Sequence, residues 1–133
     1  MSRQRAKGTR LERAAADYLA AALNDDRVDR MPLHGKGDRG DIAGVRTVMG
    51  ERVCVEVKNV TRMNLAGWVN EAVTEAGNAD ADVAVVVHKR VGKGDPGEQY
   101  VTMRLRDFAV LLGAQVHPFR PDEIGQLKEE RNV

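Results

Sequence analysis

The pattern of apolar and polar positions predicts three helices, over residues 9–24, 64–78 and 107–112. In the first two segments apolar side chains recur every three or four positions, which places them along one side of a helix. The third segment is short, and its apolar residues fit either the core or an interface between two copies of the chain. The second segment holds Trp68, the single tryptophan, for which core packing and a dimer surface are both open.

Five strands are predicted between these helices, over residues 27–33, 41–48, 52–60, 82–88 and 99–105. Residues 82–88 form a continuous apolar run, which is typical of a central strand buried on both faces. The segment 34–40 contains three glycines and predicts a loop. The order α-β-β-β-α-β-β-α predicts an α/β domain in which helices flank a mixed central sheet.

The composition fits one domain spanning residues 1–133. We expect residues 1–8 to form a mobile basic arm and residues 121–133 to form a peripheral tail. The single cysteine, Cys54, excludes a disulfide framework and favours a reducing, cytoplasmic setting. No apolar run approaches the roughly 20 residues that a membrane span needs, so no membrane partner is expected.

The net charge of +1 argues weakly against a nucleic-acid partner, but the charges are unevenly distributed. Residues 1–13 and 27–46 each contain five basic residues, whereas residues 64–82 contain four acidic residues and no lysine or arginine. Only the local field steers a polyanion, so this division is compatible with separate basic and acidic faces. A mixed solvated surface is the alternative.

The candidate chemistry lies in two adjacent predicted strands. Side chains alternate along a strand, so Glu56 and Lys58 share one face while the valines between and beside them share the other. If the strands 41–48 and 52–60 pair as a hairpin, Asp41 comes beside the end that carries Glu56 and Lys58. Two converging carboxylates suit Mg²⁺, and a neighbouring ammonium group offsets charge on a phosphate.

Glu12 has two possible roles. Helical spacing puts its carboxylate at the border of the apolar face, from which it could point towards the end of the sheet and help to hold a metal. Alternatively, Thr9 and Glu12 fit a capping box, in which Glu12 would accept a hydrogen bond from the Thr9 backbone N–H.

The segments Lys7–Arg13 (KGTRLER), Gly40–Ile42 (GDI) and Val55–Asn59 (VEVKN) together resemble the PD-(D/E)xK nuclease superfamily. The likeness is greatest to Holliday-junction resolvases of the archaeal type and to resolvase-like proteins of bacteriophages, and it covers about the first 60 residues. The resemblance implies a restriction-endonuclease-like fold. It also implies Glu12, Asp41, Glu56 and Lys58 as catalytic residues, with Mg²⁺, replaceable by Mn²⁺, held by Asp41, Glu56, Glu12 and the Val57 carbonyl.

The same resemblance implies a homodimer that cleaves four-way DNA junctions during recombination and repair, in the host cytoplasm if a phage encodes it. Phosphates would be positioned by basic residues that flank the acids in sequence, namely Arg5, Lys7, Arg10, Arg13, Lys36 and Arg39. The alternatives are a repair- or restriction-type nuclease of the same fold and a DNA-binding module without catalysis.

Two positions depart from the superfamily pattern. Gly40 stands where the motif has proline, a tolerable change if that position mainly sets the backbone. The serine of the resolvase loop has no clear counterpart, so Asp38 or Lys36 substitutes for it or its role is absent. His34, in the same loop, is a possible substrate contact.

Overall fold

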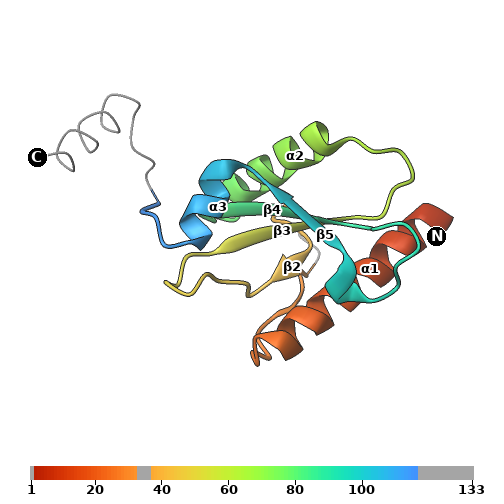
Figure 1. The fold of residues 1–133 in the computed structure, drawn as a ribbon, viewed down its shortest axis with the longest axis horizontal. Coiled ribbons are helices and arrows are strands. Elements are labelled where there is room, and N and C mark those ends of the chain that lie inside the picture. The colour runs from red at the N-terminus through yellow and green to blue at the C-terminus, as the bar shows by residue number, and fades with distance from the viewer. Residues whose placement is uncertain (1, 33–36, 117–133) are drawn as a thin grey trace, which may run out of the picture.

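A computed structural model of the protein, which describes residues 2–32 and 37–116, has an α/β fold built on a five-stranded mixed sheet (Figure 1). This confirms the predicted fold class. The strands lie in the order β1-β2-β3-β4-β5. Their bounds are β1 Asp29–Arg30, β2 Ile42–Ala43, β3 Val53–Lys58, β4 Val83–His88 and β5 Tyr100–Met103. The helices are α1 Arg3–Ala22, α2 Leu65–Asn78, the 3-10 turn η1 Pro96–Glu98, and α3 Leu105–Leu111.

The strand directions bring three chain segments to one edge of the sheet. β3 and β4 are parallel, and α2 connects them, so their carboxyl ends meet at the same edge. β2 is antiparallel to β3, with Ile42 opposite Val55, so the residues that precede β2 lie beside the second half of β3. The predicted hairpin of the two strands is therefore confirmed.

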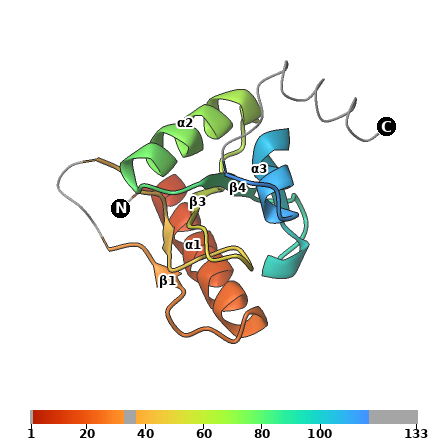
Figure 2. The same cartoon turned by 90° about the vertical axis from the view of Figure 1, so that its left-hand side faces the viewer.

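The helix α1 covers one face of the sheet and the helix α2 covers the other (Figures 1 and 2). The alternation along β3 assigns its side chains as the sequence predicted. Val53, Val55 and Val57 pack in the cluster that contains α1, whereas Cys54 packs in the cluster that contains α2. Glu56, which falls on the same face as Cys54, therefore faces α2.

The core on the α2 side includes Trp68, which is 6% exposed and packs with Ala72, Ala76 and Val86. Such burial makes Trp68 a core residue, and its alternative role on a dimer surface is wrong. In the segment 107–112, Val110 is buried in the α1-side core, whereas Phe108 and Leu112 are 47% and 73% exposed. An interface between two copies at the exposed residues stays a prediction.

The amino-terminal segment differs from the prediction, because α1 begins at Arg3 where a mobile arm was expected over residues 1–8. The Ser2 side chain accepts a hydrogen bond from the Arg5 N–H at 3.1 Å and caps the helix, and Gln, Ala, Lys and Arg are good helix formers. Thr9 therefore lies inside α1 and donates its hydroxyl to the Arg5 carbonyl at 2.9 Å. The capping box between Thr9 and Glu12 is thus wrong.

The strand predicted over residues 41–48 is shorter than expected. Gly44 has a φ of +83°, outside the extended region, and a Cβ there would lie 2.3 Å from the Arg27 carbonyl oxygen. The regular pairing stops at Ala43, and a single bridge between Arg46 and Arg52 follows. The tail predicted over residues 121–133 lies outside the described residues. Within the described ranges, no helix has the length and apolar character needed to cross a bilayer.

Candidate functional site

Asp41 lies directly before β2 and is fixed against β3 by its backbone and its side chain. Its N–H donates to the Val55 carbonyl at 2.8 Å, and its Oδ2 accepts from the Val57 N–H at 2.7 Å. These two bonds place the carboxyl group beside Glu56, the intervening residue of β3. The prediction that the hairpin brings Asp41 to this part of the strand is confirmed.

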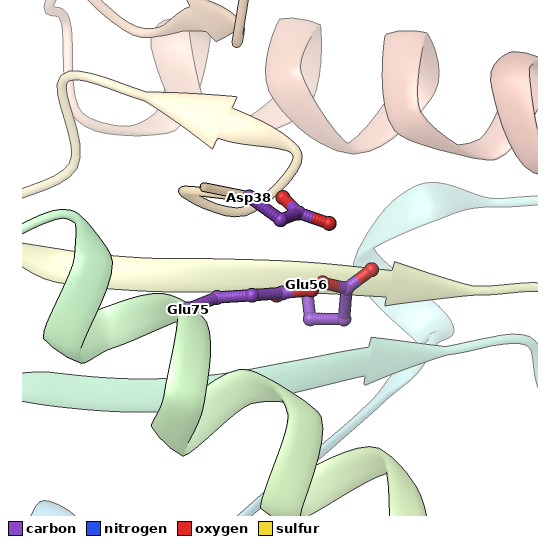
Figure 3. Close-up of side chains that lie close together, drawn as sticks. All are labelled: Asp38, Glu56 and Glu75. Atoms are coloured by element: carbon purple, nitrogen blue, oxygen red, sulfur yellow. The ribbon is translucent and has the colours of Figure 1, made fainter. Parts of the chain in front are cut away.

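Three carboxylates from three different elements converge on the α2 face of the sheet (Figure 3). Asp38 comes from the loop before β2, Glu56 from β3 and Glu75 from α2. One oxygen of each lies within 4.8 Å of an oxygen of each of the others. Glu56 and Glu75 are buried, with 6% and 7% exposure, whereas Asp38 is exposed. We call Asp38, Glu56 and Glu75 the carboxylate cluster.

Asp38 is held in place by two hydrogen bonds, one to its side chain and one to its backbone carbonyl. Its Oδ1 accepts the Gly40 N–H at 2.9 Å, and its carbonyl accepts from Asn78 Nδ2 at 2.8 Å. Gly40 has a φ of +94°, and a Cβ there would lie 2.9 Å from Cys54 Sγ. Proline fixes φ near about −65°, so proline could not occupy this backbone conformation. Gly40 is therefore not the neutral replacement for proline that the motif comparison suggested.

Burial and mutual proximity hold protons on these acids. Burial is the main cause that raises the pKa of Asp41 to about 8, and the neighbouring Glu56 carboxyl is the second. Burial is also the main cause that raises the pKa of Glu56 to about 8, and the neighbouring Glu75 carboxyl is the second. Burial raises the pKa of Glu75 to about 7, and Asp38 and Asp41 add to the increase. Like charges at close range disfavour ionisation of the whole group unless a cation compensates them.

Two of the buried carboxylate oxygens, Glu56 Oε2 and Glu75 Oε2, have no hydrogen-bond partner among the described residues. A buried acceptor without a donor costs free energy, and a cation would remove that cost. The atoms available to a metal ion at this position are carboxylate oxygens, the hard ligands that Mg²⁺ prefers. By this test Glu56 and Glu75 fit a magnesium site, whereas Asp41 is not a member of the carboxylate cluster and its role as a ligand stays a prediction.

Lys58 lies at the end of β3, one alternation beyond Glu56, and its Nζ donates to Glu71 Oε2 on α2 at 2.7 Å. Burial alone would lower the pKa of Lys58, but the carboxylates of Glu71 and Glu56 outweigh it and the pKa is raised. The side chain is therefore a cation at neutral pH, suited to offset negative charge and unsuited to accept a proton.

The Glu12 side chain, on α1, is bound by Arg30 of β1. Arg30 Nη2 and Nε donate to Glu12 Oε2 at 3.1 and 3.3 Å. Burial and the nearby Asp41 raise the pKa of Glu12, although Arg30 opposes the shift. Asp41 thus lies near enough to Glu12 to raise the pKa of Glu12, but Glu12 is not a member of the carboxylate cluster. A ligand role for Glu12 would require exchange of Arg30 for the metal.

The residues predicted to contact DNA differ in their exposure and in their ion pairs. Arg5 and Arg10 are exposed on α1, and the Lys7 carbonyl accepts from Asn59 Nδ2 at 3.5 Å, next to Lys58. Arg13, by contrast, binds Asp29 and Asp17 at 2.7 and 3.3 Å.

Arg39 follows Asp38 in the loop and is exposed. Lys36 and His34 lie outside the described residues. For all six of these basic residues, contact with DNA stays a prediction.

The sequence interpretation missed the contribution of α2. The acidic stretch of residues 64–82 was expected to lie on a separate face, whereas α2 supplies Glu71 and Glu75 to this region. A signal was present, because Glu75 follows Trp68 by seven residues and Ala72 by three. That spacing puts Glu75 on the same buried side of the helix.

We compared the chain with protein-family models, with curated proteins and with solved structures, and none of them matches it. The case for a function therefore depends on the residues of the site and on the motif resemblance.

The raised pKa values predict how metal-free protein responds to pH. Asp41, Glu56 and Glu75 hold protons in the folded state up to about pH 7–8, whereas the unfolded chain releases them near about pH 4. The stabilisation that these protonated side chains give the folded state is therefore complete below about pH 4 and is lost as the pH rises through 7–8. We expect the free energy of unfolding to fall by at least about 1 kcal/mol between pH 6 and pH 9.

Denaturant titrations in the presence of a chelator measure this dependence. Glu75→Gln should flatten it, whereas Glu98→Gln, a change at an exposed acid paired with Arg90, should not. A free energy of unfolding that rises between pH 6 and pH 9 would contradict the prediction.

Proposed function

We propose that the protein is a Mg²⁺-dependent endonuclease that hydrolyses phosphodiester bonds in branched DNA, with four-way junctions as the preferred substrate. The observation that carries the proposal is the meeting of Asp41 and Glu56 at one sheet edge with Lys58 at the next position on the same face. The order of these residues in the chain matches the motif that the sequence resembles.

The chain's own groups have separable tasks in this proposal. Asp41 and Glu56 would hold the metal, whose bound form polarises a phosphate and lowers the pKa of a coordinated water. The Val57 N–H fixes the orientation of the Asp41 carboxylate, which leaves the other oxygen of Asp41 available. Lys58 would exchange Glu71 for a phosphate oxygen and offset the charge that develops there.

The basic side chains of α1 support DNA as the polymer. Exposed arginines and Lys7 lie on the first half of α1, whose Lys7 carbonyl contacts Asn59 directly after β3. Such side chains position a phosphate backbone without reading its sequence. A two-fold junction would be cut symmetrically by a homodimer, which we include in the proposal.

A cleavage assay tests the proposal. The full chain with Mg²⁺ is incubated with a labelled four-way junction, a linear duplex and single-stranded DNA, beside Asp41→Asn and a Mg²⁺-free control. We expect paired symmetric nicks in the junction, and loss of cleavage in Asp41→Asn and without Mg²⁺.

Each other result has a definite meaning. Cleavage of all three substrates would favour a repair- or restriction-type nuclease. Binding of DNA without cleavage would favour a non-catalytic module. Cleavage by Asp41→Asn at the wild-type rate would refute the site assignment.

A further inference from the structure

We infer that Asp38, Glu56 and Glu75 form a divalent-cation position beside the one predicted at Asp41, with Glu56 shared between the two. The inference deepens the proposed nuclease site, because Glu56 belongs to both positions, but its geometry does not depend on DNA. Neither Glu75 nor α2 is part of the motif that suggested the nuclease.

The convergence of the carboxylate cluster is the first line of support. Two oxygens bound to one Mg²⁺ at about 2.1 Å lie at most about 4.2 Å apart, and the limit for Ca²⁺ is about 5 Å. The oxygens of Asp38, Glu56 and Glu75 lie within 4.8 Å of one another. Small side-chain rotations would therefore suffice to bring all three onto a Mg²⁺ or Mn²⁺ ion.

The unpartnered oxygens are the second and independent line. Glu56 and Glu75 are more than nine-tenths buried, and Oε2 of each lacks a donor among the described residues. In Figure 3 both side chains extend towards the region below Asp38. A side chain that served packing alone at these positions would not need a carboxylate, whereas a cation would satisfy both oxygens at once.

The surroundings provide access and rigidity. A surface pocket lies between the Asp38 loop and α2, lined by Asp38, Thr74, Glu75 and Asn78 among others. An ion could thus reach the buried carboxylates from the Asp38 side. Asn78 and the Gly40 N–H hold Asp38 in place, as outer groups commonly do for metal ligands.

Mn²⁺ binding to the full chain without DNA tests the inference, measured by calorimetry and by the loss of the free-ion EPR signal. We expect Glu75→Gln and Asp38→Asn each to weaken binding at this position by about 10-fold or more. Asp80→Asn removes the same charge from an exposed residue at the end of α2, whose φ of +56° suits asparagine, and should bind as wild type does.

Thermal unfolding separates a missing ligand from a damaged fold. Without metal, Glu75→Gln should unfold at or above the wild-type temperature at pH 8, and added Mn²⁺ should raise that temperature less than it does for wild type. The inference is overturned if wild type binds no Mn²⁺ at millimolar concentration, or if Glu75→Gln binds it with wild-type affinity and stoichiometry.

The outcome is independent of the cleavage assay. Glu75-dependent Mn²⁺ binding by a chain that cuts no DNA would uphold the cation position and refute the nuclease. Junction cleavage together with unaltered Mn²⁺ binding by Glu75→Gln would uphold the nuclease and refute the cation position.

Discussion

Lys58→Ala is expected to lower the rate of junction cleavage in Mg²⁺ by about 100-fold or more, the loss typical of removing one charged group that stabilises a transition state. The Lys58 ammonium is the nearest described cation on the strand that carries Glu56, and Glu71 keeps it protonated. Single-turnover rates on a labelled four-way junction measure the effect. The fold should persist, because a partly exposed ion pair contributes at most about 1 kcal/mol.

Glu71→Gln distinguishes a role on the phosphate from a role in the ion pair alone. Both variants break the contact between Lys58 and Glu71, but Glu71→Gln leaves the ammonium in place. We expect Glu71→Gln to cut within a few-fold of wild type, and Lys93→Ala, which removes an exposed lysine from the turn after β4, to cut equally well. Wild-type cleavage by Lys58→Ala would show that Lys58 has no part in the reaction.

Asp107→Ala is expected to lower the free energy of unfolding by about 2–3 kcal/mol, because the buried Ala84 N–H loses its acceptor and the partly exposed Arg104 loses its partner. Asp107 is 1% exposed and lies in the first turn of α3. Its Oδ2 accepts from Arg104 Nε at 2.8 Å, and its Oδ1 accepts from the Ala84 N–H at 3.1 Å. The pairing of β4 with β5 starts at Val85, so Asp107 supplies the acceptor for the preceding N–H.

Guanidinium chloride titrations measure this loss, with Asp17→Ala as the matched control. Asp17 is an exposed partner of Arg13, and its removal should cost less than about 1 kcal/mol. Asp107→Asn keeps an acceptor for the Ala84 N–H and should lie between the two. Equal midpoints for Asp107→Ala and Asp17→Ala would show that the buried contacts do not anchor α3.

The predictable part of the site is the part within one hairpin. Asp41, Glu56 and Lys58 lie within 18 residues of one another in the sequence, and strand alternation alone relates Glu56 to Lys58. The antiparallel pairing of β2 with β3 then follows from two adjacent strands joined by a turn, which is why the contact of Asp41 with β3 was anticipated. The same local reasoning failed at Thr9, because Ser2 caps α1 seven residues earlier.

The element types, the faces of β3 and the placement of Asp41 follow from the sequence, because they depend on periodicities within short segments. The folded structure was needed to place the acidic helix α2 over Glu56, where it adds Glu71 and Glu75 to this region. It was also needed to show that Arg30 binds Glu12 and that Gly40 adopts a conformation closed to proline. These relations depend on which residues distant in the chain become neighbours when β3 and β4 pair in parallel, and no local pattern encodes that pairing.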